Sequence, residues 1–251
     1  MLKSERLRNI LQAVKMQKFV TVDELAKALD VSNMTIRRDL NELSDSGKIS
    51  RIHGGAQLVT DQARGEKSYK QKREIHGKEK IEIAKRACNL IHERDSIYVG
   101  PGTTLELLVA HLKVKHLRII TNSLPVFEAA KNNMNDYDLI LVGGSYRRIS
   151  GAFVGALANN ELQTMSFSVG FVGVNGIKDT ALTTANLEEG QTESIGLDHS
   201  QMKFVVADYS KLNQSDFHKF YDLRKVDGLI TNREVKPDVE KHYSQFTTVY
   251  K

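Results

Sequence analysis

The stretch SIYVGPGTTLELL (residues 96–108) joins an apolar run, a glycine-rich turn and an amphipathic pattern. Ile97-Tyr98-Val99 is typical of a short buried strand, and the residues after Thr104 have helical periodicity. A strand that leads directly into a helix predicts an α/β fold. The loop between them, Gly100-Pro101-Gly102-Thr103-Thr104, is either an ordinary tight turn or a phosphate cradle at a helix start.

The same alternation continues through the rest of the C-terminal two thirds of the chain. Short apolar runs separated by amphipathic segments predict a largely parallel sheet with helices on both faces. The predicted strands are residues 117–121, 138–144, 168–174, 203–208 and 226–231, and the predicted helices include 78–91, 103–112 and 124–133.

Small, hydroxyl and amide residues follow these strands where each one ends. In α/β sheets ligands bind at the carboxyl edge of the strands. Backbone N–H groups at a helix start and threonine hydroxyls suit a phosphate or sugar oxygens. We therefore predict a pocket for a polar small molecule, with candidate residues Gly100, Gly102, Thr103, Thr104, Asn122, Ser123, Gly144, Arg147, Asn175, Asp208 and Lys211.

A bound phosphate dianion requires nearby cations. Lys211, three residues after Asp208, is the best placed, and Asp208 would orient it or bind sugar hydroxyls. Lys72 and Lys80 belong to a basic segment, residues 67–86, that would fold over the site. The residues alone leave open that all four side chains form surface ion pairs of little energetic value.

The segment TVDELAKALDVSNMTIRRDLNELSDSG (residues 21–47) predicts two short helices joined by a tight turn. Thr21 and Glu24 have the spacing of a capping box, and Ser32 is a cap for the second helix. An amphipathic helix pattern also precedes the segment. The predicted inward residues are Leu7, Ile10, Leu11, Val14, Val22, Leu25, Ala26, Leu29, Ile36, Leu40 and Leu43.

Polar and basic residues crowd the first turns of the second helix, the part that helix-turn-helix proteins insert into the major groove. Asparagine and threonine read base edges, and arginine binds guanine or phosphate. Residues 48–59 predict a hairpin wing, in which His53 either contacts DNA or is a turn residue without a contact. The candidate DNA-binding residues are Ser32, Asn33, Met34, Thr35, Arg37, Arg38, Arg51 and His53.

Composition narrows the class of protein. The chain has 251 residues, a formal net charge of +5 and 40% hydrophobic residues, which permits nucleic-acid binding without establishing it. It contains no apolar run of 18 residues and no signal peptide, so we expect a cytoplasmic protein with no membrane partner. Cys88 is the single cysteine, which excludes an internal disulfide and a cysteine metal cluster. We expect no metal or other cofactor.

The segment MTIRRDLNELSDSGKISRIHGGA (residues 34–56) closely resembles the winged helix-turn-helix of DeoR-type bacterial transcriptional repressors. Later blocks, among them IITNSLPV, LVGGSYRRISGAFVG and ADYSKLNQSDF, resemble the sensor domain of the same family. The resemblance implies a second domain similar to ribose-5-phosphate isomerase that binds a sugar phosphate. Family motifs fall on Lys72, on Lys80, and on Asp208 and Lys211 of an Asp-x-Ser-Lys pattern.

These motifs and the resemblance divide the chain into three predicted segments. We predict a winged helix-turn-helix DNA-binding domain at residues 1–58, a basic linker at 59–75 and a sugar-phosphate sensor domain at 76–251. Helix-turn-helix proteins bind two operator half-sites, so we also expect a homo-oligomer, either a dimer or a tetramer.

Two features resemble one branch of the family, the lactose phosphotransferase system repressors. They are the Gly-Pro-Gly loop at residues 100–102 and the segment GAFVGALAN (residues 151–159). This resemblance implies repression of a lactose or galactose operon through the tagatose 6-phosphate pathway. Tagatose 6-phosphate or galactose 6-phosphate would then release the repressor from operator DNA.

An isomerase-like enzyme is the alternative from another class. Sugar-phosphate isomerisation requires a carboxylate that moves a proton between adjacent carbons. The isomerases carry it after a central strand, where this chain has Gly173-Val174-Asn175-Gly176. Glu188 and Glu189 are near in sequence, but helix capping or binding of sugar hydroxyls is the simpler role for them. We therefore predict no catalytic residue; regulation of another sugar or sugar-alcohol operon also stays open.

Overall fold

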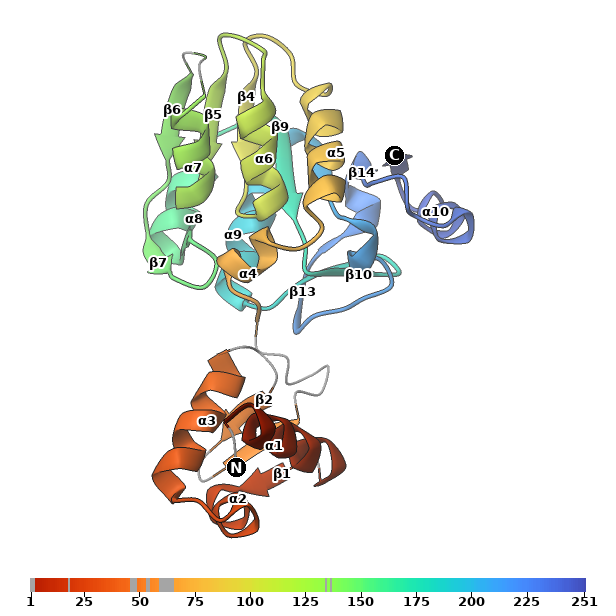
Figure 1. The fold of residues 1–251 in the computed structure, drawn as a ribbon. Helices are drawn as coiled ribbons and strands as arrows, with labels where there is room; N and C mark the ends of the chain where they lie inside the picture. Colours follow the sequence, from red (N-terminus) through yellow and green to blue (C-terminus); the bar gives the residue numbers. More distant parts are fainter. Residues whose placement is uncertain are drawn as a thin grey trace. The chain divides into compact units, whose positions relative to one another are not determined.

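The computed structural model describes residues 3–17, 19–45, 49–52, 55–58, 66–133, 135 and 137–251. The chain divides into two compact units, Met1–Lys67 and Ser68–Lys251 (Figure 1). No helix in the described part of the chain is both long enough and apolar enough to cross a membrane.

The first unit packs helices against a small antiparallel sheet of order β1-β3-β2. Its buried residues are the apolar positions expected from the helical periodicity, such as Ile10, Leu25 and Leu40, joined by Ala56 from the sheet. Its elements are α1 (Lys3–Gln17), β1 (Phe19–Thr21), α2 (Val22–Leu29), α3 (Asn33–Asp45), β2 (Ile49–Ile52) and β3 (Gly55–Leu58). The predicted helix pair and hairpin are both present.

Side-chain caps mark the starts of both α2 and α3. The Thr21 hydroxyl accepts a hydrogen bond from the Glu24 backbone N–H at 3.2 Å, and the Glu24 carboxylate accepts one from the Thr21 N–H at 2.8 Å. This is the predicted capping box. Asp30 ends α2 in the left-handed region with a φ of 51°. The Ser32 hydroxyl then accepts from the Thr35 N–H at 3.3 Å, so Ser32 caps α3 as expected.

The second unit is built on a seven-stranded sheet of order β15-β14-β12-β9-β4-β5-β6, in which every neighbouring pair is parallel. The predicted strands are all present, and the edge strand β15 is an addition. The strands are β4 (Ser96–Val99), β5 (Arg118–Thr121), β6 (Asp138–Leu141), β9 (Phe167–Gly173), β12 (Ser200–Val206), β14 (Gly228–Ile230) and β15 (Thr248–Tyr250).

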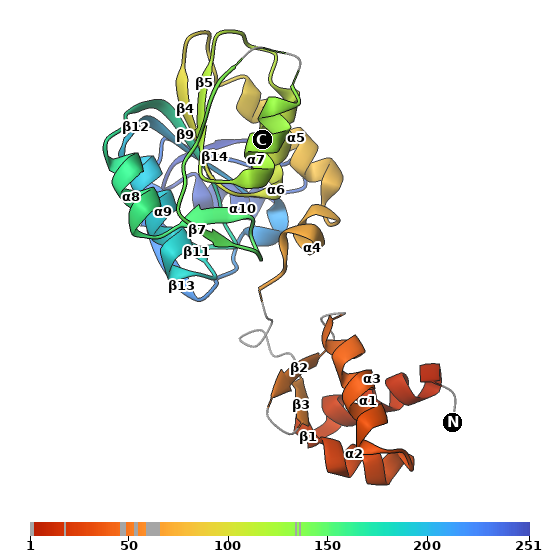
Figure 2. The ribbon, with the colours of Figure 1, turned by 90° about the vertical axis from the view of Figure 1, so that its left-hand side faces the viewer.

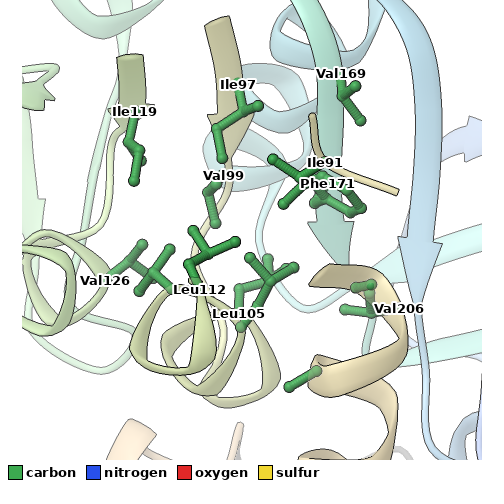
Figure 3. Packing of buried hydrophobic residues seen from close by; sticks show 14 of the residues in the cluster. Ile91, Ile97, Val99, Leu105, Leu112, Ile119, Val126, Val169, Phe171 and Val206 are labelled. Atoms are coloured by element: carbon green, nitrogen blue, oxygen red, sulfur yellow. The ribbon is translucent and has the colours of Figure 1, made fainter. Parts of the chain in front are cut away.

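Helices cover both faces of this sheet, with α5, α6 and α7 on one face and α8 and α9 on the other (Figures 1 and 2). In the first layer, Leu105 and Val126 pack on Ile97, Val99 and other strand residues (Figure 3). The helices are α4 (Tyr69–Arg73), α5 (Gly77–Cys88), α6 (Thr103–His111), α7 (Leu124–Lys131), α8 (Ala156–Gln163), α9 (Leu187–Asp198) and α10 (Pro237–Tyr243), with 3-10 turns η1 (Tyr209–Lys211) and η2 (Leu223–Lys225).

Two smaller sheets lie beside the main one. The segment after the predicted strand 138–144 contains β7 (Ser145–Arg147), which forms an antiparallel hairpin with β8 (Ala152–Val154). Gly144 enters it with a φ of 144°, and a Cβ there would lie 2.8 Å from the Val154 carbonyl oxygen, so only glycine fits. The other sheet joins β10 (Gly176–Lys178), β11 (Ala181–Thr184) and β13 (His218–Asp222).

Helix α4 extends the second unit further toward the N-terminus than the predicted sensor domain, which was expected to begin at residue 76. Its first turn is closed by a capping box between Ser68 and Gln71. The Tyr69 hydroxyl donates to Glu106 of α6 at 2.5 Å, and Arg73 forms an ion pair with the same carboxylate at 3.1 Å. These contacts attach residues 68–73, expected to be linker, to the sheet domain.

Candidate functional site

A pocket lies at the carboxyl ends of β4, β9 and β12, where the fold predicts a ligand site. Predicted ligand residues that line it are Lys72, Lys80, Gly102, Thr103, Thr104, Asn175, Asp208 and Lys211. The pocket is also lined by residues that were not predicted from the sequence, among them Tyr69, Ile75, Pro101, Ser150, Thr184 and Glu193.

The start of α6 forms one wall of this pocket. Gly102 occupies the cap position and provides no side chain to bond the first turn. Its carbonyl oxygen accepts the first helical hydrogen bond, from Glu106 N–H at 2.9 Å. The N–H groups of Thr103 and Thr104 precede that bond and carry the positive end of the helix dipole. This wall favours an anion.

Lys80 provides a buried positive charge, because only 5% of this residue is exposed to solvent. Its ammonium group donates hydrogen bonds to the carbonyl oxygens of Lys72 and, at 2.7 Å, of Ile75. Burial lowers the pKa of Lys80 to about 8; the Asp208 carboxylate opposes this shift, and the charges of Lys211 and Lys72 add to it. Three ammonium groups thus interact around one carboxylate, an arrangement that an anionic ligand would stabilise.

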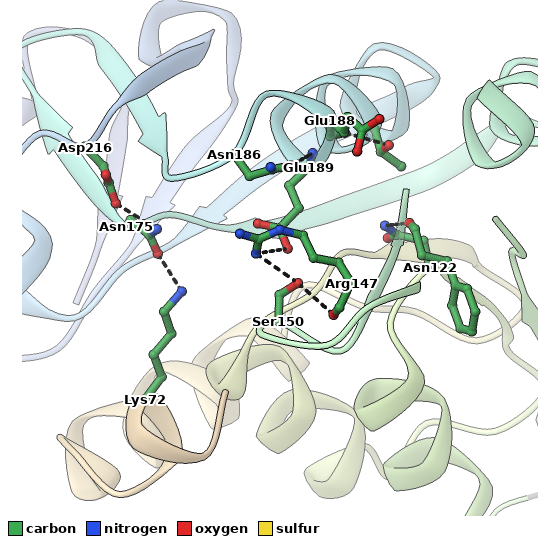
Figure 4. A network of polar contacts seen from close by, with 11 residues as sticks. Lys72, Asn122, Arg147, Ser150, Asn175, Asn186, Glu188, Glu189 and Asp216 are labelled. Atoms are coloured by element: carbon green, nitrogen blue, oxygen red, sulfur yellow. Dashed lines mark hydrogen bonds and ion pairs between the residues drawn. The ribbon is translucent and has the colours of Figure 1, made fainter. Parts of the chain in front are cut away.

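Asn175 binds Lys72 directly, and Asp208 stabilises the turn that carries Lys211. The Lys72 ammonium donates to the Asn175 side-chain oxygen at 3.0 Å, and the Asn175 amide donates to Asp216 at 2.9 Å (Figure 4). Asp208 accepts hydrogen bonds from the backbone N–H of Ser210, at 3.0 Å, and from its hydroxyl. Asp208 therefore shapes the turn η1 that carries Lys211.

Helix α9 contributes two carboxylates, Glu189 and Glu193, which lie one turn apart and both line the pocket. Burial raises the pKa of Glu193 well above its usual range, the Glu189 charge raises it further, and Lys72 opposes the shift. The loop at residues 173–176 lacks a carboxylate, yet α9 brings two into the pocket in addition to Asp208. Their i, i+4 spacing after the Asn186 cap was the signal that sequence reasoning missed.

Several predicted ligand residues do not line the pocket. The Asn122 side chain is buried and bonded inside the protein, since its oxygen accepts from the Tyr98 hydroxyl and its amide donates to the Phe153 carbonyl, both at 2.9 Å. Ser123 caps α7 by accepting from the Val126 N–H. The Gly100 N–H donates to the Phe171 carbonyl of the sheet, and Gly144 shapes the β7–β8 hairpin. These four residues support the site instead of forming its surface.

Arg147 also lies outside the lining but contacts it indirectly. Its guanidinium group is 3.4 Å from Oε1 of Glu189 and 3.5 Å from the Ser150 hydroxyl (Figure 4). Both of those partners line the pocket. Arg147 therefore holds one pocket carboxylate from the β7–β8 hairpin.

The first unit presents a separate set of exposed residues on α3. Met34 is 77% exposed, and Arg37 and Arg38 are exposed beside it. Ser32 and Thr35 bond each other through their hydroxyls at 3.0 Å, and Asn33 donates to Asp23 of α2 at 2.7 Å. The predicted wing residue His53 and the side chain of Arg51 lie outside the described residues.

Comparison with protein families decides the classification. Residues 6–62 match the DeoR-like helix-turn-helix domain, and residues 75–233 match the DeoR C terminal sensor domain. The chain belongs to the DeoR family. Family membership makes it a DNA-binding regulator.

Relatives within the DeoR family align over the whole chain. The lactose phosphotransferase system repressor of Lactococcus lactis subsp. lactis is 41% identical over 252 residues, 99% of this chain and 98% of that one. The repressor of the same name from Streptococcus mutans is 36% identical and covers 99% of both chains. Ribose 5-phosphate isomerase A of Methanocaldococcus jannaschii matches 53% of each chain at 18% identity with a TM-score of 0.39, which supports no functional comparison.

Proposed function

We propose that this DeoR-family chain represses a lactose or galactose operon and leaves operator DNA when a sugar phosphate of the tagatose 6-phosphate pathway occupies the pocket. The observation that carries the proposal is the convergence of Lys72, Lys80 and Lys211 with the start of α6 in one pocket of a sensor domain. The full-length similarity to two lactose phosphotransferase system repressors supports the choice of operon.

The chemistry of the pocket suits a phosphorylated sugar. Ammonium groups and helix-start N–H groups stabilise a phosphate dianion. The hydroxyls of Thr104, Ser150 and Thr184 and the carboxylates of α9 offer partners for sugar hydroxyls. We propose tagatose 6-phosphate or galactose 6-phosphate as the inducer, and a different preferred hexose phosphate would indicate another sugar operon.

The DNA-binding residues remain those of the helix-turn-helix. We propose that α3 enters the major groove with Met34, Arg37 and Arg38 toward the DNA, and that Arg51 and His53 act from the wing. A homodimer or homotetramer would place two such helices on half-sites roughly 34 Å apart or a multiple of that. We propose that the protein acts in the cytoplasm, where its operator is accessible.

Release from DNA follows from thermodynamic linkage. If the sugar phosphate binds better to a conformation that holds the two DNA-binding domains out of register, DNA and ligand weaken each other's affinity by the same factor. The chain between the helix-turn-helix and Lys72 and Lys80 is the covalent route for that coupling.

The experiment combines two titrations of the full chain. Operator DNA binding is measured by fluorescence anisotropy while tagatose 6-phosphate or galactose 6-phosphate is added, and the thermal stability of the protein is followed with the same sugars. A ligand at 100 times its dissociation constant adds about 2.7 kcal/mol to the free energy of unfolding. Unchanged DNA affinity with every hexose phosphate tested would contradict the proposal.

The enzyme alternative has its own test. We propose that the pocket binds without turnover, since the residue 173–176 loop lacks a carboxylate and Arg147 pairs with Glu189. Incubation of the protein with aldose and ketose 6-phosphates, followed by NMR, should show no interconversion. Measurable isomerisation above the rate in buffer would establish catalysis.

A further inference from the structure

One oxygen atom of the pocket, Oε1 of Glu189, is in an ion pair but has no hydrogen-bond donor among the described residues. Glu189 is buried, and within the part of the chain that the structure describes its Oε1 atom accepts no hydrogen bond. The guanidinium group of Arg147, 3.4 Å away, balances the charge without an aligned hydrogen bond. A buried carboxylate oxygen without a hydrogen-bond donor costs free energy, so its presence needs an explanation.

The position of Glu189 in the pocket indicates which group donates the missing hydrogen bond to its Oε1 atom. Because this residue lines the pocket, a ligand can supply the missing donor. The donor must be compatible with a second carboxyl group, Glu193, one helical turn away. A hydroxyl group satisfies both conditions, because it is neutral, small and able to donate to a carboxylate oxygen.

The charges of the pocket divide into two groups. Lys80 interacts with Asp208, Lys211 and Lys72, whereas Glu193 interacts with Glu189 and Lys72. Lys72 is therefore common to both groups. A phosphate is attracted to the lysine group and repelled by the Glu189 carboxylate of α9. A phosphorylated polyhydroxy compound accordingly has one preferred orientation.

We infer that Glu189 recognises a hydroxyl group of the ligand by accepting its hydrogen bond at Oε1, which directs the sugar end of the molecule to α9 and its phosphate to the lysine group. The inference rests on the proposed function and specifies the ligand class of the same pocket. Arg147 holds the carboxylate in place from the β7–β8 hairpin.

The inference also predicts what the pocket rejects. A carboxylate offers only acceptor atoms, so it binds hydroxyl donors and repels a second carboxylate. A hexose 6-phosphate should therefore bind well, and 6-phosphogluconate, which carries a carboxylate at the end opposite its phosphate, should bind poorly. Glu189 is thus a specificity-determining residue that favours sugar phosphates with uncharged hydroxyl groups at the end opposite the phosphate.

The test is calorimetric titration of the full chain with galactose 6-phosphate, tagatose 6-phosphate, 6-phosphogluconate and inorganic phosphate. Glu189→Gln should weaken binding of whichever hexose 6-phosphate the unaltered chain binds by roughly 10- to 100-fold, the usual loss for a hydrogen bond to a charged group. Affinity for inorganic phosphate should stay within about twofold, and the discrimination against 6-phosphogluconate should shrink. Glu188→Gln, an exposed neighbour on the same helix, is the matched control and should change none of these values.

Each outcome separates the inference from the function it rests on. If the unaltered chain binds neither hexose phosphate, the proposed function fails first. If it binds one of them and Glu189→Gln binds that sugar equally well, the inference is overturned. An equal loss for inorganic phosphate would also overturn it, because Glu189 would then be acting through the fold. If the glutamine variant is unstable, Glu189→Asp replaces it in the test. This variant keeps the charge but withdraws the oxygen atoms by one carbon, and it should show the same selective loss of hexose 6-phosphate affinity.

Discussion

The buried ammonium group of Lys80 donates a hydrogen bond to the backbone carbonyl oxygen of Lys72, eight residues earlier in the chain. Its second acceptor is the Ile75 carbonyl oxygen, so one charged group ties α5 to the end of α4. Lys72 in turn donates from its own side chain to Asn175. The charge of Lys80 therefore both organises this side of the pocket and lies within it.

Replacement of Lys80 tests that dual role. Lys80→Met should leave operator binding intact and weaken release by the sugar phosphate by at least about tenfold, since a charge-assisted contact is lost. The measurement is the sugar-phosphate concentration that half-dissociates the operator complex. Lys78→Met removes an exposed charge from the same helix and should behave like the unaltered chain. Normal induction of the Lys80 variant would refute the pocket assignment.

The pH dependence of ligand binding follows from the same residue. Burial lowers the pKa of Lys80 to about 8, so its charge is lost as the pH rises through this value. Affinity for inorganic phosphate should fall between about pH 7 and pH 9 in the unaltered chain, and the bound anion should move the fall to a higher pH. Calorimetry at several pH values measures this, and Lys80→Met should flatten that part of the profile. A profile that Lys80→Met leaves unchanged would show that another group is responsible.

The lowered pKa of Lys80 also affects the stability of the fold, but this contribution rises with pH whereas the ligand affinity falls. Between about pH 8 and the ordinary lysine value of 10.5, the unfolded chain binds more protons at this position than the folded chain. The contribution of Lys80 to the free energy of unfolding therefore rises with pH in that window. Urea denaturation at pH 8 and pH 10 should show a smaller increase, or a larger decrease, in Lys80→Met than in the unaltered chain.

The recognition helix can be separated from the sensor by two substitutions. Arg37→Ala with Arg38→Ala should abolish specific operator binding, because guanidinium groups at this part of a recognition helix typically contact bases or phosphates. Galactose 6-phosphate or tagatose 6-phosphate should still stabilise the variant in a thermal-shift assay. Arg118→Ala, which removes one exposed arginine charge from the second unit, is the control for the loss of a surface charge outside α3. Undiminished operator affinity in the double variant would refute the assignment of α3.

Close packing of α9 on the sheet gives a prediction for stability. A Cβ added at Gly196 would lie 2.1 Å from the buried ring of Tyr98. Gly196→Ala should therefore lower the free energy of unfolding by roughly 1–3 kcal/mol, the usual cost of overpacking. Gly77→Ala, at a helical position with open space, should be neutral or raise stability by up to about 1 kcal/mol. Equal stability of the two variants in urea would contradict the described contact between α9 and β4.

Much of the fold could be predicted from periodicity and capping residues. The α2–α3 pair has local signals at Thr21 and Ser32, and the main strands are short apolar runs. The hairpin β7–β8 was missed because Ser145 and Tyr146 are exposed and lack the alternation of a half-buried strand. Helix α4 was missed because its basic side chains resemble a solvated linker, and its attachment to Glu106 is a long-range contact.

The position of the pocket could be predicted from the sequence, but the set of residues that line it could be predicted only in part. The rule that ligands bind at the carboxyl ends of strands located Thr103, Asn175 and Lys211. The same rule also selected Asn122, whose amide is used inside the protein, because a sequence does not show which buried polar groups are already satisfied. Glu193 lies in mid-helix, where an inward carboxylate cannot be distinguished from a solvated one without the packing of α9.

Helix α4 also has a practical consequence for exchanging parts between relatives. The matched sensor-domain region begins at residue 75, yet Tyr69 and Lys72 lie before that boundary and line the pocket. A chimera joined at residue 75 would combine Lys72 of one parent with Lys80 of the other, and its ligand preference would belong to neither. A junction before Ser68 keeps both lysines from the same parent and preserves the specificity of the donor.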